Sequence, residues 1–397
     1  MTKDREISIG SSSGLKVARI STVAFFVETQ LKQQILDMIA EGFLVTVIAS
    51  EPALENPIAG ANYKSIKIPR EISVINDLVA IFKLYRFFRM NRLDIVHSTT
   101  PKAGLVTAVA AYMARVPVRI HTYTGQVWVE KKGLVRFLAK RADQLIAWLN
   151  TQCYADSPSQ VTFLLKNHIV PEARIKCLGW GSLAGVDLVR FSAGNYSEID
   201  RLNLRAALNI PSDHKVLTFI GRCTRDKGIA ELLKAFEQVI RSDVKAILLI
   251  VGPAEGNALA QLDDLDQATR ACIRQIGFTA VPEKHLAICD LFVLPSYREG
   301  FGTVVIEAAA MSVPAIGTQI YGLKDAIVDN QTGCLVPVRN VPELAAAMRY
   351  LLIDDQRRQE MGRSAFERVR DCFSDKYVNQ LLIKEYLNLI SNQRSST

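Results

Sequence analysis

The stretch LPSYREGFGTVVIE, residues 294–307, decides how this sequence is interpreted. It begins at the end of an apolar run, 291–294, which is typical of a buried parallel strand. Proline, serine and glycine then break the run, and the apolar periodicity from Gly302 to Val313 predicts a helix. A helix start presents backbone N–H groups and the positive end of the helix dipole. The stretch therefore predicts a junction between a strand and a helix that can bind an anion.

Two carboxylates flank this junction, Glu299 and Glu307. A carboxylate repels phosphate, but it accepts hydrogen bonds from the hydroxyl groups of a sugar. Gly300 and Gly302 allow a ligand to approach the backbone closely. Together these residues indicate a nucleotide-sugar site. The alternative is an ordinary loop followed by a helix on which Glu307 is simply solvated.

A second anion-binding stretch, IGRCTRDKG at residues 220–228, lies upstream. It ends a predicted strand, turns at Gly221, and places Arg222 and Lys227 before the next predicted helix. Two permanent cations and a helix start can hold a diphosphate without a metal ion. The order of residues is not that of a P-loop. The alternative is a solvated turn with incidental basic residues.

The composition fits a folded protein with two domains, since 397 residues with 49% hydrophobic side chains can bury two cores. Seven scattered cysteines fit a reducing cytosol and suggest no structural metal site. Residues 1–187 hold 23 Lys and Arg against 15 Asp and Glu, whereas the rest of the chain is balanced at 25 against 25. The net charge of +8 therefore lies in the first half, which predicts an anionic partner for that half alone.

Alternating strand and helix patterns predict an α/β fold with two Rossmann-like domains built on parallel sheets. The predicted strands are 17–20, 44–49, 94–97, 118–121, 153–156, 216–220, 246–251, 291–294 and 314–317. The predicted helices are 30–40, 77–90, 103–114, 134–149, 229–240, 302–313, 341–352 and 377–390, with another beginning at Ser159. The expected division is a loose tail (1–14), a first domain (15–190), a second domain (200–375) and a final helical segment (376–397). In such sheets ligands bind at the carboxyl ends of the strands.

The motif from Gly221 to Gly228, taken with Glu299 and Glu307, resembles the retaining GT-B glycosyltransferases of the glycogen synthase and bacterial mannosyltransferase type. The segments 122–127, 156–160 and 181–187 are more narrowly similar to bacterial enzymes that build glycans linked to polyprenyl diphosphate. The resemblance implies the GT-B arrangement of two facing domains, with the last helix packing back on the first. It also implies a metal-independent enzyme that needs no cofactor.

The resemblance further assigns roles to individual residues. Arg222 and Lys227 would hold the donor diphosphate, with backbone N–H groups from Gly302 and Thr303. Glu307 would accept hydrogen bonds from the ribose. The donor sugar would meet Glu299, and the donor would also contact Gly300 and Phe301. The leaving phosphate would take the proton of the acceptor, so the mechanism needs no protein nucleophile.

His121 ends a predicted strand, where a single histidine is more often part of the core than a ligand. The resemblance favours the second role, because the family's histidine on this strand contacts the donor sugar; with Glu299 it completes the expected catalytic pair. His97 ends a neighbouring strand and is a weaker candidate for the wall of the site. The segment 21–27 departs from the family because it lacks the glycine-rich loop that many members have there.

Two segments of the first half, 81–92 and 131–141, alternate basic with aromatic and aliphatic residues. Either could be an ordinary amphipathic helix. Their place in the half that holds the net charge favours an anionic membrane surface, and no nucleic-acid motif accompanies them. We therefore expect peripheral attachment to the inner face of the cytoplasmic membrane.

Together with this resemblance, the sequence predicts retaining transfer of a sugar, of the HexNAc type and from a UDP-sugar, to a polyprenyl-diphosphate-linked glycan. Such a step belongs to the assembly of bacterial surface polysaccharide or lipopolysaccharide. Two alternatives stay open. One is a sugar-nucleotide epimerase of the same fold, and the other is a nucleotide-sugar binding protein without catalytic activity.

Overall fold

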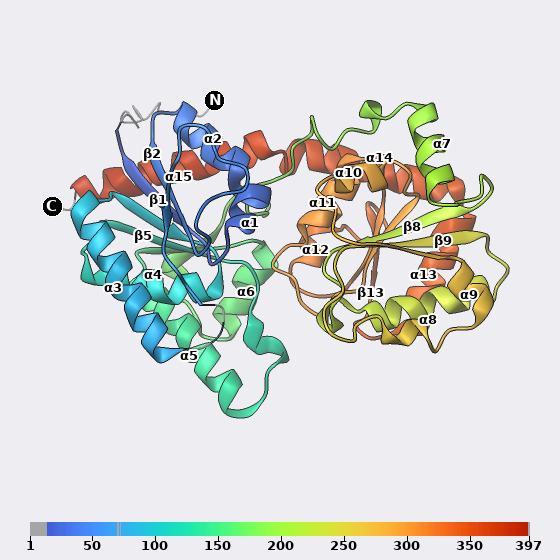
Figure 1. The fold of residues 1–397 in the computed structure, drawn as a ribbon, viewed down its shortest axis with the longest axis horizontal. Helices are drawn as coiled ribbons and strands as arrows, with labels where there is room; N and C mark the ends of the chain where they lie inside the picture. The colour runs from blue at the N-terminus through green and yellow to red at the C-terminus, as the bar shows by residue number, and fades with distance from the viewer. Residues whose placement is uncertain (1–13, 70, 72, 396–397) are drawn as a thin grey trace, which may run out of the picture. The chain divides into compact units, whose positions relative to one another are not determined.

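The fold was analysed in a computed structural model that describes residues 14–69, 71 and 73–395. The chain forms two compact units (Figure 1): the first contains residues up to Ala184 together with the segment from Asp375, and the second contains Gly185–Ser374. The chain therefore leaves the first unit and returns to it with its final helix. The predicted tail 1–14 lies, apart from Gly14, outside the described residues.

The first unit is built on a parallel sheet in the strand order β3-β2-β1-β4-β5-β6-β7. The strand order changes direction between β1 and β4, so this pair marks the point where loops diverge at the carboxyl edge. The strands are β1 (Lys16–Ile20), β2 (Leu44–Ala49), β3 (Asn62–Ser65), β4 (Ile95–Ser98), β5 (Val118–Tyr123), β6 (Gln152–Ala155) and β7 (Ile175–Cys177).

Helices cover both faces of this sheet. On one face α4 packs between α3 and α5, and on the other α15 packs beside α2. The helices are α1 (Ala24–Phe26), α2 (Lys32–Ala40), α3 (Val74–Asn91), α4 (Pro101–Met113), α5 (Gly133–Leu149), α6 (Pro158–Lys166) and α15 (Asp375–Ser395). A π-helical turn, η1 (Val27–Leu31), joins α1 to α2, and short 3₁₀ turns occupy η2 (Val127–Glu130) and η3 (Glu172–Arg174).

The second unit repeats this architecture with the strand order β10-β9-β8-β11-β12-β13, again with all strands parallel. Here the order changes direction between β8 and β11, the strands that precede the two anion-binding motifs. The strands are β8 (Lys215–Ile220), β9 (Ala246–Val251), β10 (Ile273–Ile276), β11 (Leu291–Leu294), β12 (Ala315–Thr318) and β13 (Gly333–Val336).

The helices of the second unit also form two layers, in which α8 packs with α13 and α11 packs with α14. They are α7 (Glu198–Ala207), α8 (Ile229–Ile240), α9 (Gln267–Ala271), α10 (Pro282–Leu286), α11 (Thr303–Ala310), α12 (Leu323–Ala326), α13 (Val341–Ile353) and α14 (Asp355–Cys372). Short 3₁₀ turns occupy η4 (Ala193–Asn195), η5 (Arg225–Lys227) and η6 (Ala260–Leu262). Central strands such as β9 are buried along their whole length, as expected for a sheet covered on both faces.

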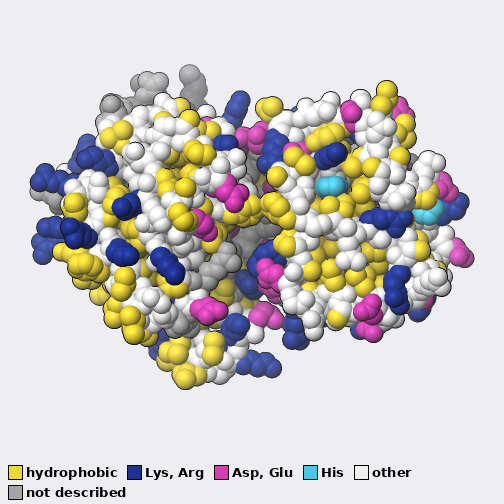
Figure 2. Space-filling model, viewed as in Figure 1, with side chains coloured by type: hydrophobic (Ala, Val, Ile, Leu, Met, Phe, Trp, Pro, Cys, Tyr) yellow, Lys and Arg dark blue, Asp and Glu magenta, His cyan; other side chains and the backbone are white. Residues whose placement is uncertain are grey.

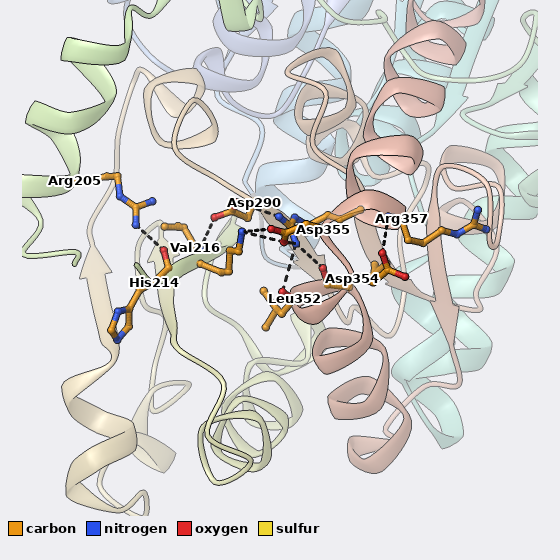
Figure 3. Close-up of polar contacts among 11 residues, drawn as sticks. Arg205, His214, Val216, Asp290, Leu352, Asp354, Asp355 and Arg357 are labelled. Atoms are coloured by element: carbon orange, nitrogen blue, oxygen red, sulfur yellow. Dashed lines mark hydrogen bonds and ion pairs between the residues drawn. The ribbon is translucent and has the colours of Figure 1, made fainter. Parts of the chain in front are cut away.

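Polar contacts close the edge of the second sheet where β8 begins (Figure 3). The backbone N–H of Val216 donates to the Asp290 carboxylate at 2.8 Å, and Arg205 donates to the carbonyl oxygen of His214 at 2.6 Å. Asp354 caps α14 by accepting from the N–H of Arg357 at 2.8 Å. These side chains serve the fold at the amino edge, and the opposite, carboxyl edge holds the motifs.

Candidate active site

The loops after β8 and β11 meet at the carboxyl edge of the second sheet, because these two strands are hydrogen-bonded neighbours. The loop after β8 contains η5 and reaches α8 through Gly228. A Cβ atom on Gly228 would lie 2.1 Å from the carbonyl oxygen of Pro295, and its φ of +72° favours glycine. Glycine at this position therefore allows the first anion-binding loop to pack directly against the second.

Lys227 and Glu299 join the two motifs. The lysine Nζ donates to Oε1 of Glu299 at 2.5 Å, and both side chains are largely shielded, with 20% and 13% of their surface exposed. The hydroxyl of Ser296 donates to the same carboxylate oxygen at 2.8 Å, and Thr318 donates to the carbonyl oxygen of Ser296. The ammonium group is therefore held in one place before any ligand arrives.

Arg222 has a different carboxylate partner. Its Nη1 lies 2.9 and 3.0 Å from the two oxygens of Glu255, and about half of each side chain is exposed. An exposed ion pair of this kind contributes little to stability. Arg222 can consequently exchange Glu255 for a ligand anion at small cost, whereas Lys227 is fixed.

The start of α11 supplies the second anion-binding feature. Gly302 is the residue before the helix, with a φ of +88°, and Thr303 is its first residue. No side chain within the described chain caps this helix start by a hydrogen bond. Backbone N–H groups there face outward from the helix end and can bind a phosphate oxygen.

Glu307 lies in the second turn of α11 and is partly buried. Burial raises the pKa of its carboxyl group to about 7, Arg190 opposes that rise, and Glu283 adds to it. Arg190 itself donates to Glu283 at 2.8 Å. A carboxyl group with such a pKa changes its ionisation near neutral pH, and its ionised form is an acceptor for the hydroxyl groups of a ribose.

Further contacts between the loops were not anticipated from the sequence. The N–H of Tyr297 donates to the carbonyl oxygen of Asp226 at 2.8 Å, and Arg298 forms an ion pair with the Asp226 carboxylate at 3.0 Å. The Tyr297 hydroxyl donates to Glu231 at 2.7 Å. These residues tie the loop after β11 to the loop after β8. In the sequence, the signal for these contacts was the presence of Tyr297 and Arg298 within the stretch 294–307.

Two other predicted donor contacts take a different form. The side chain of Phe301 is 3% exposed and packs against Phe373, with ring centroids 5.0 Å apart. It belongs to the core, so only its backbone is available to a ligand. Gly300 packs against Gly322, where an added Cβ atom would lie 2.6 Å from the carbonyl oxygen of Gly300.

His121 lies in the first unit, on β5, and its side chain is buried. Its Nδ1 lies 2.9 Å from the Ser98 hydroxyl, and a Cβ atom on Gly104 would come within 2.4 Å of its ring. Burial lowers the pKa of His121 to about 3, although the backbone of Ser98 opposes this shift. The ring is therefore neutral and enclosed between the sheet and α4, the arrangement of a core histidine, and its contact with a donor sugar stays a prediction.

His97 faces the opposite side of the same sheet and is also buried. Its Nδ1 lies 2.5 Å from Nη1 of Arg19 and 2.6 Å from the Tyr386 hydroxyl, and its Nε2 lies 2.7 Å from the Thr122 hydroxyl. Burial, together with the charge of Arg19, lowers its pKa well below the usual range. This histidine joins α15 to the sheet and lines a small cavity with Thr122 and Asp156. Its place in the wall of the ligand site stays a prediction.

The glycine-free segment after β1 folds directly into a helix. Thr22 is hydrogen-bonded to the Thr100 hydroxyl at 2.7 Å, and the N–H of Ala24 donates to the Glu51 carboxylate at 2.7 Å. The protein's own carboxylate therefore occupies the N–H group with which α1 begins. Phe25, next to it, is exposed.

Comparison with known proteins shows which protein families have similar sequences. Residues 200–368 match the family Glycosyl transferases group 1, and residues 27–181 match the Glycosyl transferase 4-like domain. The chain therefore carries a group 1 glycosyltransferase domain and a glycosyl transferase 4-like domain. Lys227, Glu299 and Glu307 all lie in the first matched region, and His121 lies in the second.

Two relatives have names that point to polysaccharide or glycan assembly. The chain is 29% identical over 322 residues to the capsular polysaccharide biosynthesis glycosyltransferase CapM of Staphylococcus aureus, covering 81% of this chain and 83% of CapM. It is 23% identical over 361 residues to the UDP-Gal:alpha-D-GlcNAc-diphosphoundecaprenol alpha-1,3-galactosyltransferase of Escherichia coli, covering 86% and 91% of the two chains.

Solved structures confirm the predicted GT-B fold. Sucrose-phosphate synthase from Thermosynechococcus elongatus superposes with a TM-score of 0.79 at 20% identity, over 95% of this chain and all of the other. HepE of Anabaena, solved in complex with UDP and glucose, gives a TM-score of 0.77 at 18% identity, over 96% of this chain and all of HepE. The matched domains and the named relatives together identify the chain as a glycosyltransferase of polysaccharide or glycan biosynthesis.

Proposed function

We propose that this glycosyltransferase transfers a HexNAc-type sugar from a UDP-sugar, with retention of configuration, to a glycan linked to polyprenyl diphosphate. The observation that carries the proposal is the fixed Lys227–Glu299 pair beside the uncapped start of α11. One group binds anions and the other accepts hydrogen bonds from hydroxyls, and a nucleotide sugar needs both.

The donor would lie along the carboxyl edge of the second sheet. Lys227, Arg222 and the N–H groups of Gly302 and Thr303 would hold the diphosphate, and Glu307 would accept from the ribose hydroxyls. Glu299 accepts from Lys227 and Ser296 on one oxygen, which leaves its second oxygen for a hydroxyl of the donor sugar. Together these donors would stabilise negative charge as it develops on the leaving diphosphate.

In the proposed reaction the bond between the sugar C1 and the diphosphate oxygen breaks, and a bond from C1 to the acceptor oxygen forms on the same face. The acceptor proton moves to the departing diphosphate, so UDP and the lengthened glycan are the products. The cations and the helix start supply the positive charge at the diphosphate, and the proposed reaction is therefore independent of metal ions and of other cofactors.

The acceptor would be a polyprenyl-diphosphate-linked glycan in the assembly of bacterial surface polysaccharide. Support comes from the Staphylococcus aureus relative, named for capsule biosynthesis, and from the Escherichia coli relative, named for a diphosphoundecaprenol acceptor. Such an acceptor resides in a membrane. Within the described residues, none of the helices is both long and apolar enough to cross a bilayer. We propose peripheral attachment of the first unit to the anionic inner face of the cytoplasmic membrane.

The experiment that tests the donor assignment is a panel of UDP- and GDP-sugars, measured first by thermal stabilisation and then by calorimetry. A ligand that binds only the folded protein raises the unfolding temperature. The proposal expects a UDP-HexNAc to stabilise the wild-type protein and to lose that effect in Lys227→Ala. Stabilisation by GDP-sugars alone, or equal stabilisation of the variant, would contradict it.

A further inference from the structure

The first turns of α5 are exposed on every side. Residues 131–138 are all exposed, and they include Leu134 (70%), Val135 (55%), Phe137 (53%) and Leu138 (54%). We call these four residues the α5 tip. A soluble helix normally exposes a polar face and buries an apolar stripe, and a helical segment that is apolar all round is normally buried. The α5 tip therefore needs a nonpolar environment that the chain itself does not supply.

Basic residues surround the tip. Lys131, Lys132, Arg136 and Arg141 are exposed, and the segment 131–141 contains no acidic residue. The Arg141 guanidinium lies 5.1 Å from the centre of the Phe137 ring. In Figure 2 hydrophobic side chains gather at the lower end of the first unit, with Lys and Arg side chains beside them. Apolar side chains within a ring of cations match the interface of an anionic lipid layer.

The topology of the sheet determines at which edge of the first unit the α5 tip lies. Helix α5 connects the parallel neighbours β5 and β6, so it begins at the carboxyl edge of the sheet and runs back toward the amino edge. Figure 1 shows its first turns at the lower limit of the first unit. Helix α3 also begins at this edge, and its first turns expose Ile75, Leu78 and Phe82. Both apolar helix starts therefore belong to the edge at which ligands bind.

We propose that the α5 tip inserts into the acyl layer of an anionic membrane, together with the start of α3 at the same edge, so that the carboxyl edge of the first sheet faces the bilayer. This inference rests on the membrane-linked acceptor proposed above and adds the orientation. The exposed cations Arg86 and Arg89 lie in the second half of α3, and Arg92 directly follows its last residue. At about 1.5 Å per residue Arg89 is ~22 Å along the axis from Val74, beyond the Debye length of about 8 Å at physiological salt. They contribute little to attachment in this orientation.

The test is flotation of the full chain with vesicles of phosphatidylcholine, with and without phosphatidylglycerol. Phe137→Gln/Leu138→Gln is expected to lower binding to the anionic vesicles by about tenfold or more, given the apolar area withdrawn from lipid. Two matched controls are expected to bind like the wild type. Trp148→Gln removes an aromatic side chain that is 63% exposed in the last turn of the same helix, at the opposite edge. Arg86→Gln/Arg89→Gln/Arg92→Gln removes the distant cations.

The outcomes separate this inference from the proposed function. Release by the α3 triple variant and retention by the tip variant would overturn insertion but leave a membrane acceptor in place. A wild-type chain that binds neither vesicle would overturn insertion and membrane attachment together. A dimer in solution that dissociates in the tip variant would assign the tip to a second copy and overturn insertion. An unfolding temperature and a circular dichroism spectrum of the tip variant that match the wild type show that any loss of flotation is not a loss of fold in the first unit.

Discussion

Replacing Lys227 with alanine removes a largely shielded cation that joins the two motifs. In the free protein its Nζ lies 2.5 Å from Glu299, and its side chain is 20% exposed. Two unit charges 4 Å apart interact by roughly 4 kcal/mol at an effective dielectric constant of about 20. Desolvation of the ammonium group and its sharing with Glu299 reduce that figure. We therefore expect the variant to lose about 1.5–3 kcal/mol of binding free energy, the range for a hydrogen bond to a charged group.

This loss corresponds to a roughly ten- to hundredfold higher Kd for UDP, which titration calorimetry resolves directly. The variant also leaves Glu299 partly buried with the Ser296 hydroxyl still donating to it, so the second unit should unfold a few degrees lower, at about 2–4 °C per kcal/mol. Arg241→Ala is the matched control, because it removes a cation from an exposed pair with Glu237 at the far end of α8. A Kd for Lys227→Ala within twofold of the wild type would refute the assignment.

The remaining predictions concern ionisation, the exposed ion pair and metal ions. The affinity for a UDP-sugar should rise between pH 6 and 8, because the Glu307 carboxyl, with its pKa of about 7, ionises over that range. Glu307→Gln should bind the UDP-sugar more weakly at pH 8, with an affinity that no longer changes with pH. An affinity of this variant that still rises with pH would contradict the role of Glu307. Burial raises the pKa of Asp156 to about 8, so the protonated carboxyl contributes fully to the free energy of unfolding below pH 4, and this contribution is lost as the pH rises to 8. In denaturant titrations, the free energy of unfolding of Asp156→Asn should therefore fall less over this pH range than that of the wild type. Glu255→Gln frees Arg222 and should change the Kd for UDP by less than about fivefold, as expected for an exposed pair; a larger change would mean that Glu255 contacts the donor. Transfer activity should survive EDTA; its complete loss, restored by Mg²⁺ or Mn²⁺, would overturn the metal-independent mechanism.

The fold class was predictable because the strands are continuous apolar runs. The run 246–251 is buried throughout, and helix 229–240 was predicted with the bounds that α8 has. The elements that were missed carry weak patterns. Strand β3 lies at the edge of its sheet and has mostly exposed residues, and α14 is so polar that its apolar stripe is interrupted by the buried Arg358. Edge position and buried polar residues both erase the periodicity on which such predictions depend.

The candidate site was predictable only to the level of residue type and spacing. The two motifs follow β8 and β11, and adjacency of these strands brings Lys227 to Glu299. Nothing in the spacing could show that Arg222 would pair with Glu255, a residue from a third loop, or that the Phe301 side chain would point into the core. For His121, the buried position against Gly104 is set by helix α4, whose packing a single sequence does not reveal.

The central claim is transfer of a sugar to a glycan carried on polyprenyl diphosphate. Mass spectrometry of the acceptor after incubation with the purified protein and each UDP-HexNAc tests it most directly. The account predicts an acceptor heavier by one HexNAc residue, with release of UDP and with no product from Lys227→Ala. An unchanged acceptor together with an epimerised or intact UDP-sugar would contradict it.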